Sequence, residues 1–223
     1  MLRRLAVFGC LGTLLPILLV IAGLLLAGDV AARRYATGQL SDRISAAVPE
    51  ASGVHARIHS FPFLGRLLFN EKVSEVGVHI DRLVAVRGIV FTSLDVDLRG
   101  VGLDRHAMFS DRQIQLDHIN RGTVTVALTE QAVSAALGRP ATIAHGVIDV
   151  SVLGGQTATA TVAVSGHQLV IRVAPLPGVV VPLPNTGVLP CTPGATVGTG
   201  QVTFSCTFTR IPDAFVRLVR KAA

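Results

Sequence analysis

Glu75-Val76-Gly77-Val78-His79-Ile80 alternates polar or small residues with apolar ones at a period of two. Such alternation is typical of a β-strand with one buried face and one solvated face, as in antiparallel sheets. The same period recurs at Val54–Ile58 and at Leu94–Arg99. We therefore expect an antiparallel sheet, with further strands at residues 113–116, 123–128, 146–152, 158–164, 169–173 and 202–208.

Helical patterns flank these strands. Residues 29–48 place Ala36, Leu40 and Ile44 on one apolar stripe, and Pro49 ends the segment. Asp29 is a candidate N-cap, and the alternative is a helix continuous with the chain before it. Shorter helices are expected at 129–137, stopped by Gly138, and at 213–221. Residues 175–193 are rich in proline and predict an extended connection.

An apolar run precedes the first of these helices. Leu5–Ala27 carries no charged side chain across 23 residues, and about 20 suffice to span a bilayer. Arg3 and Arg4 before the run favour export of everything after it. A cleaved signal peptide is the alternative, but its apolar region is typically only about 7–15 residues long. We expect residues 1–28 to form a transmembrane anchor or signal segment, and 29–223 an extracytoplasmic domain.

The exported part contains two cysteines, Cys191 and Cys206. An even pair in an oxidising compartment predicts a disulfide, with two free thiols as the alternative. Two cysteines alone do not make a structural zinc site. Cys10 lies within the apolar run and is expected to be a thiol facing the bilayer.

Composition and motifs narrow the class of function. The net charge is +6, with no Trp and one Tyr, so base-stacking platforms are scarce and nucleic acid is not an expected partner. The charge suits anionic lipid headgroups, or is a generic basic surface. The motifs of serine hydrolases, zinc proteases and phosphate-binding loops are absent. We expect no enzyme, cofactor or metal site, although His55 and His59 share a strand face, as do Asp95 and Asp97.

Two stretches carry a family resemblance. Ile58-His59-Ser60-Phe61-Pro62-Phe63-Leu64, followed by Val73–Val78, resembles the LmeA-like phospholipid-binding proteins of actinobacterial cell envelopes. The resemblance implies action on the outer side of the plasma membrane, binding of phosphoinositide-type lipids and support for elongating mannan-bearing glycolipids. In plan the chain is also similar to tubular lipid-binding proteins. The expected fold is therefore α+β, a curved antiparallel sheet packed on an N-terminal helix and preceded by one transmembrane helix.

A phospholipid needs an apolar slot for its acyl chains and polar groups at the mouth of that slot. The hypothesis is an extracytoplasmic phospholipid-binding protein that supports lipid or lipoglycan handling at the plasma membrane. The alternative is a structural or assembly partner of envelope enzymes that binds no lipid. The candidate lining comprises Leu40, Ile44, Val76, Val78, Ile80, Leu94, Val96 and Leu98, and the alternative is that these residues pack a dry core.

The turn after the first strand is the second candidate element. Phe61, Phe63, Leu64 and Leu67 supply apolar bulk, and Arg66 is placed to meet a phosphate. The turn is expected either to contact lipid as a tip or gate, or to fold its aromatic rings back into the core.

Overall fold

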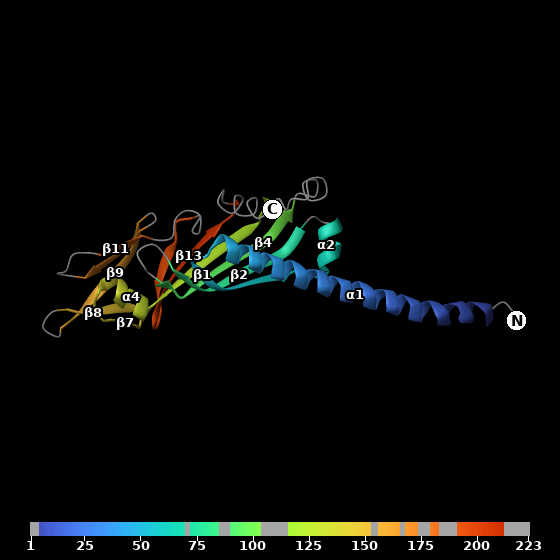
Figure 1. Cartoon of the computed structure of the whole chain (residues 1–223), viewed down its shortest axis with the longest axis horizontal. Coiled ribbons are helices and arrows are strands. Elements are labelled where there is room, and N and C mark those ends of the chain that lie inside the picture. The colour runs from blue at the N-terminus through green and yellow to red at the C-terminus, as the bar shows by residue number, and fades with distance from the viewer. Residues whose placement is uncertain are drawn as a thin grey trace.

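The computed structural model describes residues 5–69, 72–84, 90–103, 116–152, 156–165, 168–173, 179–182 and 191–211. A long helix, α1 (Leu5–Ala47), leads into two antiparallel sheets, and the short helices α2 (Phe63–Phe69) and α4 (Glu130–Leu137) accompany them. The molecule is elongated, with α1 projecting from one end and the second sheet at the other (Figure 1). The expected α+β fold is confirmed.

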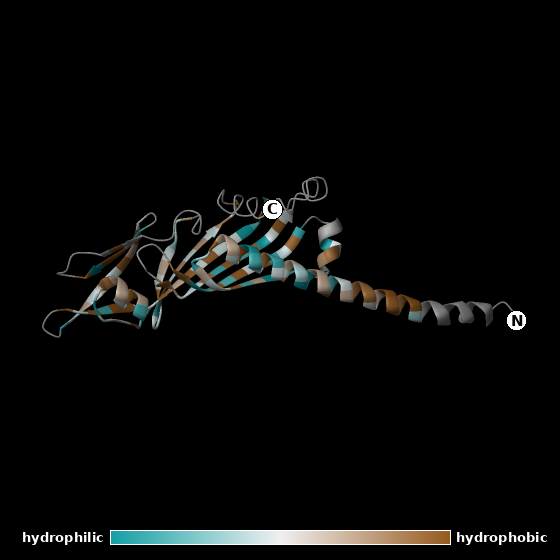
Figure 2. Ribbon diagram, in the orientation of Figure 1, coloured by the Kyte–Doolittle hydropathy of each residue, from teal (hydrophilic) through white to brown (hydrophobic). Residues whose placement is uncertain are grey.

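Helix α1 is unbroken across residues 28 and 29. The continuous-helix alternative is therefore correct, and the expectation of an N-cap at Asp29 was wrong. The part of α1 that is brown in Figure 2 projects free of the sheets, and side chains such as Leu18 and Leu24 are 62% and 68% exposed. This is the helix that is long and apolar enough to cross a membrane, among the residues described. The second half lies along the first strand, where the Ala56 amide donates to Ser41 Oγ at 2.9 Å.

The first sheet confirms the alternating strands. Its order is β1 (Ala51–His59), β2 (Lys72–Val84), β4 (Ser93–Leu103), β6 (Arg121–Thr129), β13 (Gln201–Phe208) and β12 (Gly194–Val197). Two short strands pair alongside, β3 (Val90–Phe91) with β2 and β5 (Leu116–His118) with β4. Of the strand expected at 113–116, only Leu116 lies in the described residues.

The register sorts side chains into two faces. Ala56, Val78, Val96, Val124 and Cys206 are aligned across five strands, and they form one apolar row. One residue earlier along β1, the aligned row is His55, His79, Asp95, Thr125 and Ser205. Because successive side chains of a strand point to opposite faces, the first sheet has one apolar face and one polar face.

The second sheet has the order β11 (Val179–Pro182), β10 (Gln168–Val173), β9 (Thr157–Ser165), β8 (Val147–Ser151) and β7 (Ala141–Ala144). Helix α4 precedes it, with Thr129 at the N-cap and Gly138 at the C-cap in the left-handed region (φ 63°), as expected. Ser134 Oγ accepts from the Ala141 amide at 2.9 Å and fixes α4 against β7. The helix expected at 213–221 lies outside the described residues.

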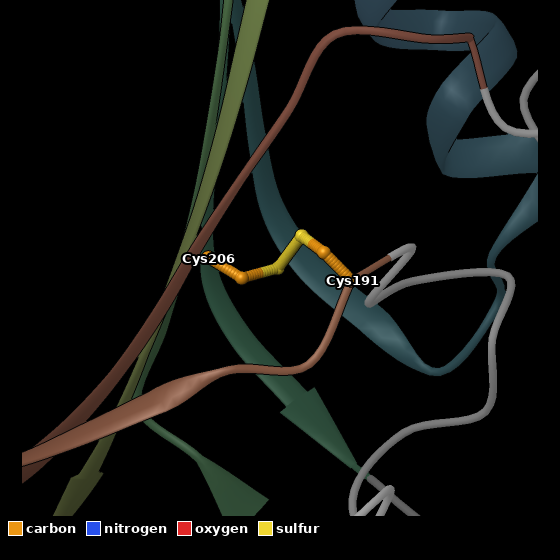
Figure 3. The surroundings of a disulfide bond; sticks show 2 residues. All are labelled: Cys191 and Cys206. Carbon is orange, nitrogen blue, oxygen red and sulfur yellow. A yellow bond between two sulfur atoms is a disulfide. The ribbon is translucent and has the colours of Figure 1, made fainter.

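A single apolar core joins the inner faces of both sheets. The side chains of Phe91, Val126, Val133, Ile148 and Phe204 are fully buried in it. The predicted disulfide is confirmed. Cys191 and Cys206 are bonded, with their Cα atoms 5.8 Å apart, and the bond ties the chain before β12 to β13 (Figure 3).

Candidate functional site

Part of the apolar face of the first sheet is incompletely covered. Val76 and Val78 on β2 and Leu98 on β4 are only half-buried, although strands pair with β2 and β4 on both sides. These side chains are therefore accessible because the face of the sheet is incompletely covered, and not because they lie on an edge strand. We call Val54, Ile58, Val76, Val78 and Leu98 the partly covered face.

Helix α1 lies along β1, the strand at the edge of this part of the sheet. Ala32 and Ala36 pack against the core, while Leu40 and Ile44, further along the same stripe, are half-buried. A helix is about 10 Å wide, and strands lie about 4.8 Å apart. One helix is therefore about as wide as two strands and cannot cover the whole of this face. Apolar side chains of both layers stay partly accessible, which is what an acyl chain needs.

The predicted lining residues divide into two groups. Leu40, Ile44, Val76, Val78 and Leu98 are half-buried. Val76, Val78 and Leu98 pack against the core on one side and keep part of their surface accessible. Ile80, Leu94 and Val96 are only 3–5% exposed and belong to the packed core. The dry-core alternative therefore describes these three residues in this structure.

The turn after β1 continues into a helix where a plain turn was expected. Phe63 is buried and Leu64 packs against the core, whereas Phe61 is 60% exposed. The core alternative thus describes Phe63, and contact of Phe61 with lipid stays a prediction. Arg66 is exposed and donates a hydrogen bond to Ser74 Oγ. The side chain of Leu67 lies outside the described residues.

Asp29 holds this turn against α1. Its side chain is 5% exposed, and Oδ1 accepts from the Leu64 amide, in the first turn of α2, at 2.7 Å. A carboxylate at that position satisfies an amide that the short helix leaves unpaired. The sequence predicted Asp29 as the N-cap of a helix that begins at residue 29, whereas in the structure it lies within α1 and its carboxylate caps α2. Ser60 is also buried, and its Oγ has no hydrogen-bond partner among the described residues.

The polar face carries a histidine between two acids. His79 Nε2 lies 3.1 Å from Asp81 Oδ1, and its Nδ1 lies 2.5 Å from Asp95 Oδ1. The hydrogen bond to Asp95 raises the pKa of His79, with a smaller contribution from Asp81, while burial opposes the change. His55 approaches Asp81 at 3.6 Å. Within the described residues, no three His, Cys, Asp or Glu side chains are arranged as metal ligands.

The family model described as LmeA-like phospholipid-binding matches residues 27–212. The chain belongs to this LmeA-like family. The match takes in α1 from the end of its apolar run, α2, and the strands of both sheets. Comparison with curated proteins and with solved structures gives no match. Membership assigns this LmeA-like protein to a class that binds phospholipid, so the partly covered face is its candidate lipid site.

Proposed function

We propose that this protein is an extracytoplasmic phospholipid-binding protein of the cell envelope, held at the plasma membrane by α1. The observation that carries the proposal is the half-buried apolar group Val76, Val78 and Leu98 in the middle of a sheet, in a member of a phospholipid-binding family. Two further features support the location. The apolar half of α1 is exposed where the structure describes its side chains, and a disulfide favours an oxidising space.

The partly covered face suits acyl chains that come from a bilayer. Moving a methylene group from water to an apolar surface gains about 0.8 kcal/mol. A lipid already in a membrane gains nothing of this kind, because its chains are already in hydrocarbon. The face must therefore replace bilayer contacts with side-chain contacts. The branched aliphatic side chains of Val, Leu and Ile present an irregular apolar surface that a flexible acyl chain can follow, which flat aromatic rings do not.

The polar end of the ligand needs hydrogen-bond donors and positive charge. Arg66 in α2 is exposed, whereas the hydroxyl of Ser60, in the turn before α2, is buried. The guanidinium of Arg66 suits a phosphate, and its several N–H groups can also donate to the hydroxyl oxygens of a phosphoinositide-type headgroup. We propose a binding role without catalysis, in support of lipid or lipoglycan handling.

The test is native mass spectrometry of the full chain purified in detergent from a phospholipid-rich membrane. We expect a co-purifying phospholipid on the wild type and its loss in Val78→Asn, which puts an amide on the partly covered face. Val147→Asn is the matched control, because Val147 is 41% exposed on the second sheet. A lipid-free mass together with a stable protein partner would refute lipid binding and support an assembly role instead.

A further inference from the structure

The turn before α2 lies at the level where the apolar part of α1 ends. Asp29 follows Ala27 by two residues, which is about 3 Å along a helix at 1.5 Å per residue. Its carboxylate accepts a hydrogen bond from the Leu64 amide. If α1 spans the bilayer as proposed, residues 61–64 are therefore held where hydrocarbon gives way to headgroups. In Figure 1, α2 stands beside α1 where that helix meets the sheet.

The exposed group on this turn is apolar. Phe61 is 60% exposed, while Phe63, two residues later, is buried. An exposed aromatic ring is unfavourable in water, but it is stabilised at a membrane interface, where Phe, Leu and Trp insert between headgroups. The exposed ring of Phe61 therefore suits a membrane interface better than water.

Basic side chains gather at the same end of the first sheet. The register aligns Glu75 with Arg99 and Arg99 with Arg121, one residue beyond the row formed by Ile58, Val76 and Leu98. Lys72 begins β2 on the α2 side, and Arg66 lies in α2 itself. All four cations are exposed, and the neighbouring acids among the described residues are Glu75, Asp97 and Asp117.

We propose that this end of the molecule is a membrane-contact surface for anionic headgroups of the same bilayer that holds α1. We call Phe61, Arg66, Lys72, Arg99 and Arg121 the basal surface. Positive charge attracts an anionic leaflet, and Phe61 adds apolar insertion. The row Ile58, Val76 and Leu98 lies at the same end of the sheet as the basal surface, but on the opposite face to Arg99 and Arg121. A lipid at this end therefore reaches the partly covered face from the bilayer without crossing bulk water. The inference rests on the proposed anchoring by α1.

The absence of Trp from the chain provides a clean reporter. The full chain carrying Phe61→Trp is reconstituted into phosphatidylcholine vesicles with phosphatidylglycerol and with brominated lipid as quencher. We expect a blue-shifted emission that brominated lipid quenches. Val147→Trp on β8, also partly exposed at 41%, is the matched control and is expected to emit as in water without quenching. Equal, water-like emission from both variants overturns the basal surface.

Charge is tested in the Phe61→Trp chain. Arg99→Gln combined with Arg121→Gln is expected to reduce quenching in vesicles that contain phosphatidylglycerol, and to leave it unchanged in pure phosphatidylcholine. Arg82→Gln, an exposed arginine at the opposite end of β2, is the control and is expected to have no effect. If the double substitution and Arg82→Gln reduce quenching equally, the result contradicts headgroup recognition by the basal surface.

The outcomes separate this inference from the proposed function. Vesicle flotation after carbonate washing reports anchoring by α1, and native mass spectrometry reports bound lipid. A Phe61→Trp chain that floats and carries lipid, but whose tryptophan emission is unquenched, refutes only the basal surface. A chain that carbonate releases refutes the anchoring and, with it, the basal surface.

Discussion

Two halves of the first sheet are built from the same alternating pattern, yet they are covered differently. On β6 and β13, Val124, Val126 and Phe204 are fully buried. On β2, Val76 and Val78 are half-buried, although Val78 belongs to the same aligned row as Val124. That row runs through both halves without a break. Hydrophobicity and register therefore do not distinguish a core from a binding surface in this sheet.

The difference lies in what covers each half. The face of β6 and β13 belongs to a core that continues into α4 and the second sheet. Phe208 also lies over Gly122, whose missing side chain leaves room for the ring. In the other half, α1 packs along β1, and its core-facing residues Ala32 and Ala36 are small. One half is thus a filled interior, and the other keeps apolar area for a ligand.

The largest expected effect is on the filled half. Phe204→Ala removes a fully buried ring and should lower the free energy of unfolding by about 3–5 kcal/mol. Phe61→Ala is the matched control, and its exposed ring should change that free energy by no more than about 0.5 kcal/mol. Urea denaturation of the full chain in detergent measures both. Similar losses for the two variants would remove the contrast between the halves.

The second-largest effect is expected from the disulfide, which stabilises the filled half. Cys191 and Cys206 are separated by 15 residues, and a loop of that length contributes about 3 kcal/mol in the chain-entropy model. Replacing both cysteines with alanine should lower the unfolding free energy by about this amount. A reductant should destabilise the wild type similarly and leave the double variant unchanged. A double variant as stable as the wild type would show that the loop is ordered without the bond.

A matched pair of valines compares the halves directly. Val126→Thr buries a hydroxyl in a fully covered site and should cost about 1–3 kcal/mol of unfolding free energy. Val78→Thr leaves its hydroxyl partly accessible and should cost less. Phospholipid recovered by extraction should show the reverse order, with Val78→Thr losing more. Equal stability costs, with unchanged lipid in both variants, would place Val78 in the core.

The smallest effect is expected on the polar face, at His79. Its raised pKa means that the folded state favours the protonated ring. The resulting stabilisation is full below the unfolded pKa of about 6.5 and is lost as the pH rises through the higher folded value. The wild type should therefore gain stability relative to His79→Gln as the pH falls from about 8 to about 6. Lipid binding should not differ, since His79 lies opposite the partly covered face.

Much of the fold could be predicted from the sequence because its signals are local. Alternation located β1, β2, β4 and β6, and Gly138 marked the end of α4. Helix α2 was missed because a short segment after Pro62, with Gly65 inside it, has the composition of a turn. It is held by a distant carboxylate, Asp29. The short strands β7, β11 and β12 were missed because their pairing partners, not their own patterns, define them.

The candidate site was predicted only in part. Alternation identifies the face on which Val78 and Val96 lie, and both residues were named on that basis. It does not reveal that Val96 is 5% exposed while Val78 is half-buried. That difference in burial depends on which elements pack against each residue, and here these are α1 and the core shared with the second sheet. Their positions are set by the fold of the whole chain and not by the local pattern. The same limit applies to Phe61 and Phe63, which differ in burial within a single turn.

The unbroken course of α1 has a mechanical consequence. A helix of 43 residues is about 65 Å long, and its proline, Pro16, lies inside the apolar half, away from the sheet. If that half spans the bilayer, the sheet cannot swing away or travel across the envelope as a domain on a flexible tether would. Any lipid it holds must be delivered within about 30 Å of the membrane, the length of the 19 residues from Asp29 to Ala47. Carriage beyond that distance requires a second, diffusing protein that comes to it.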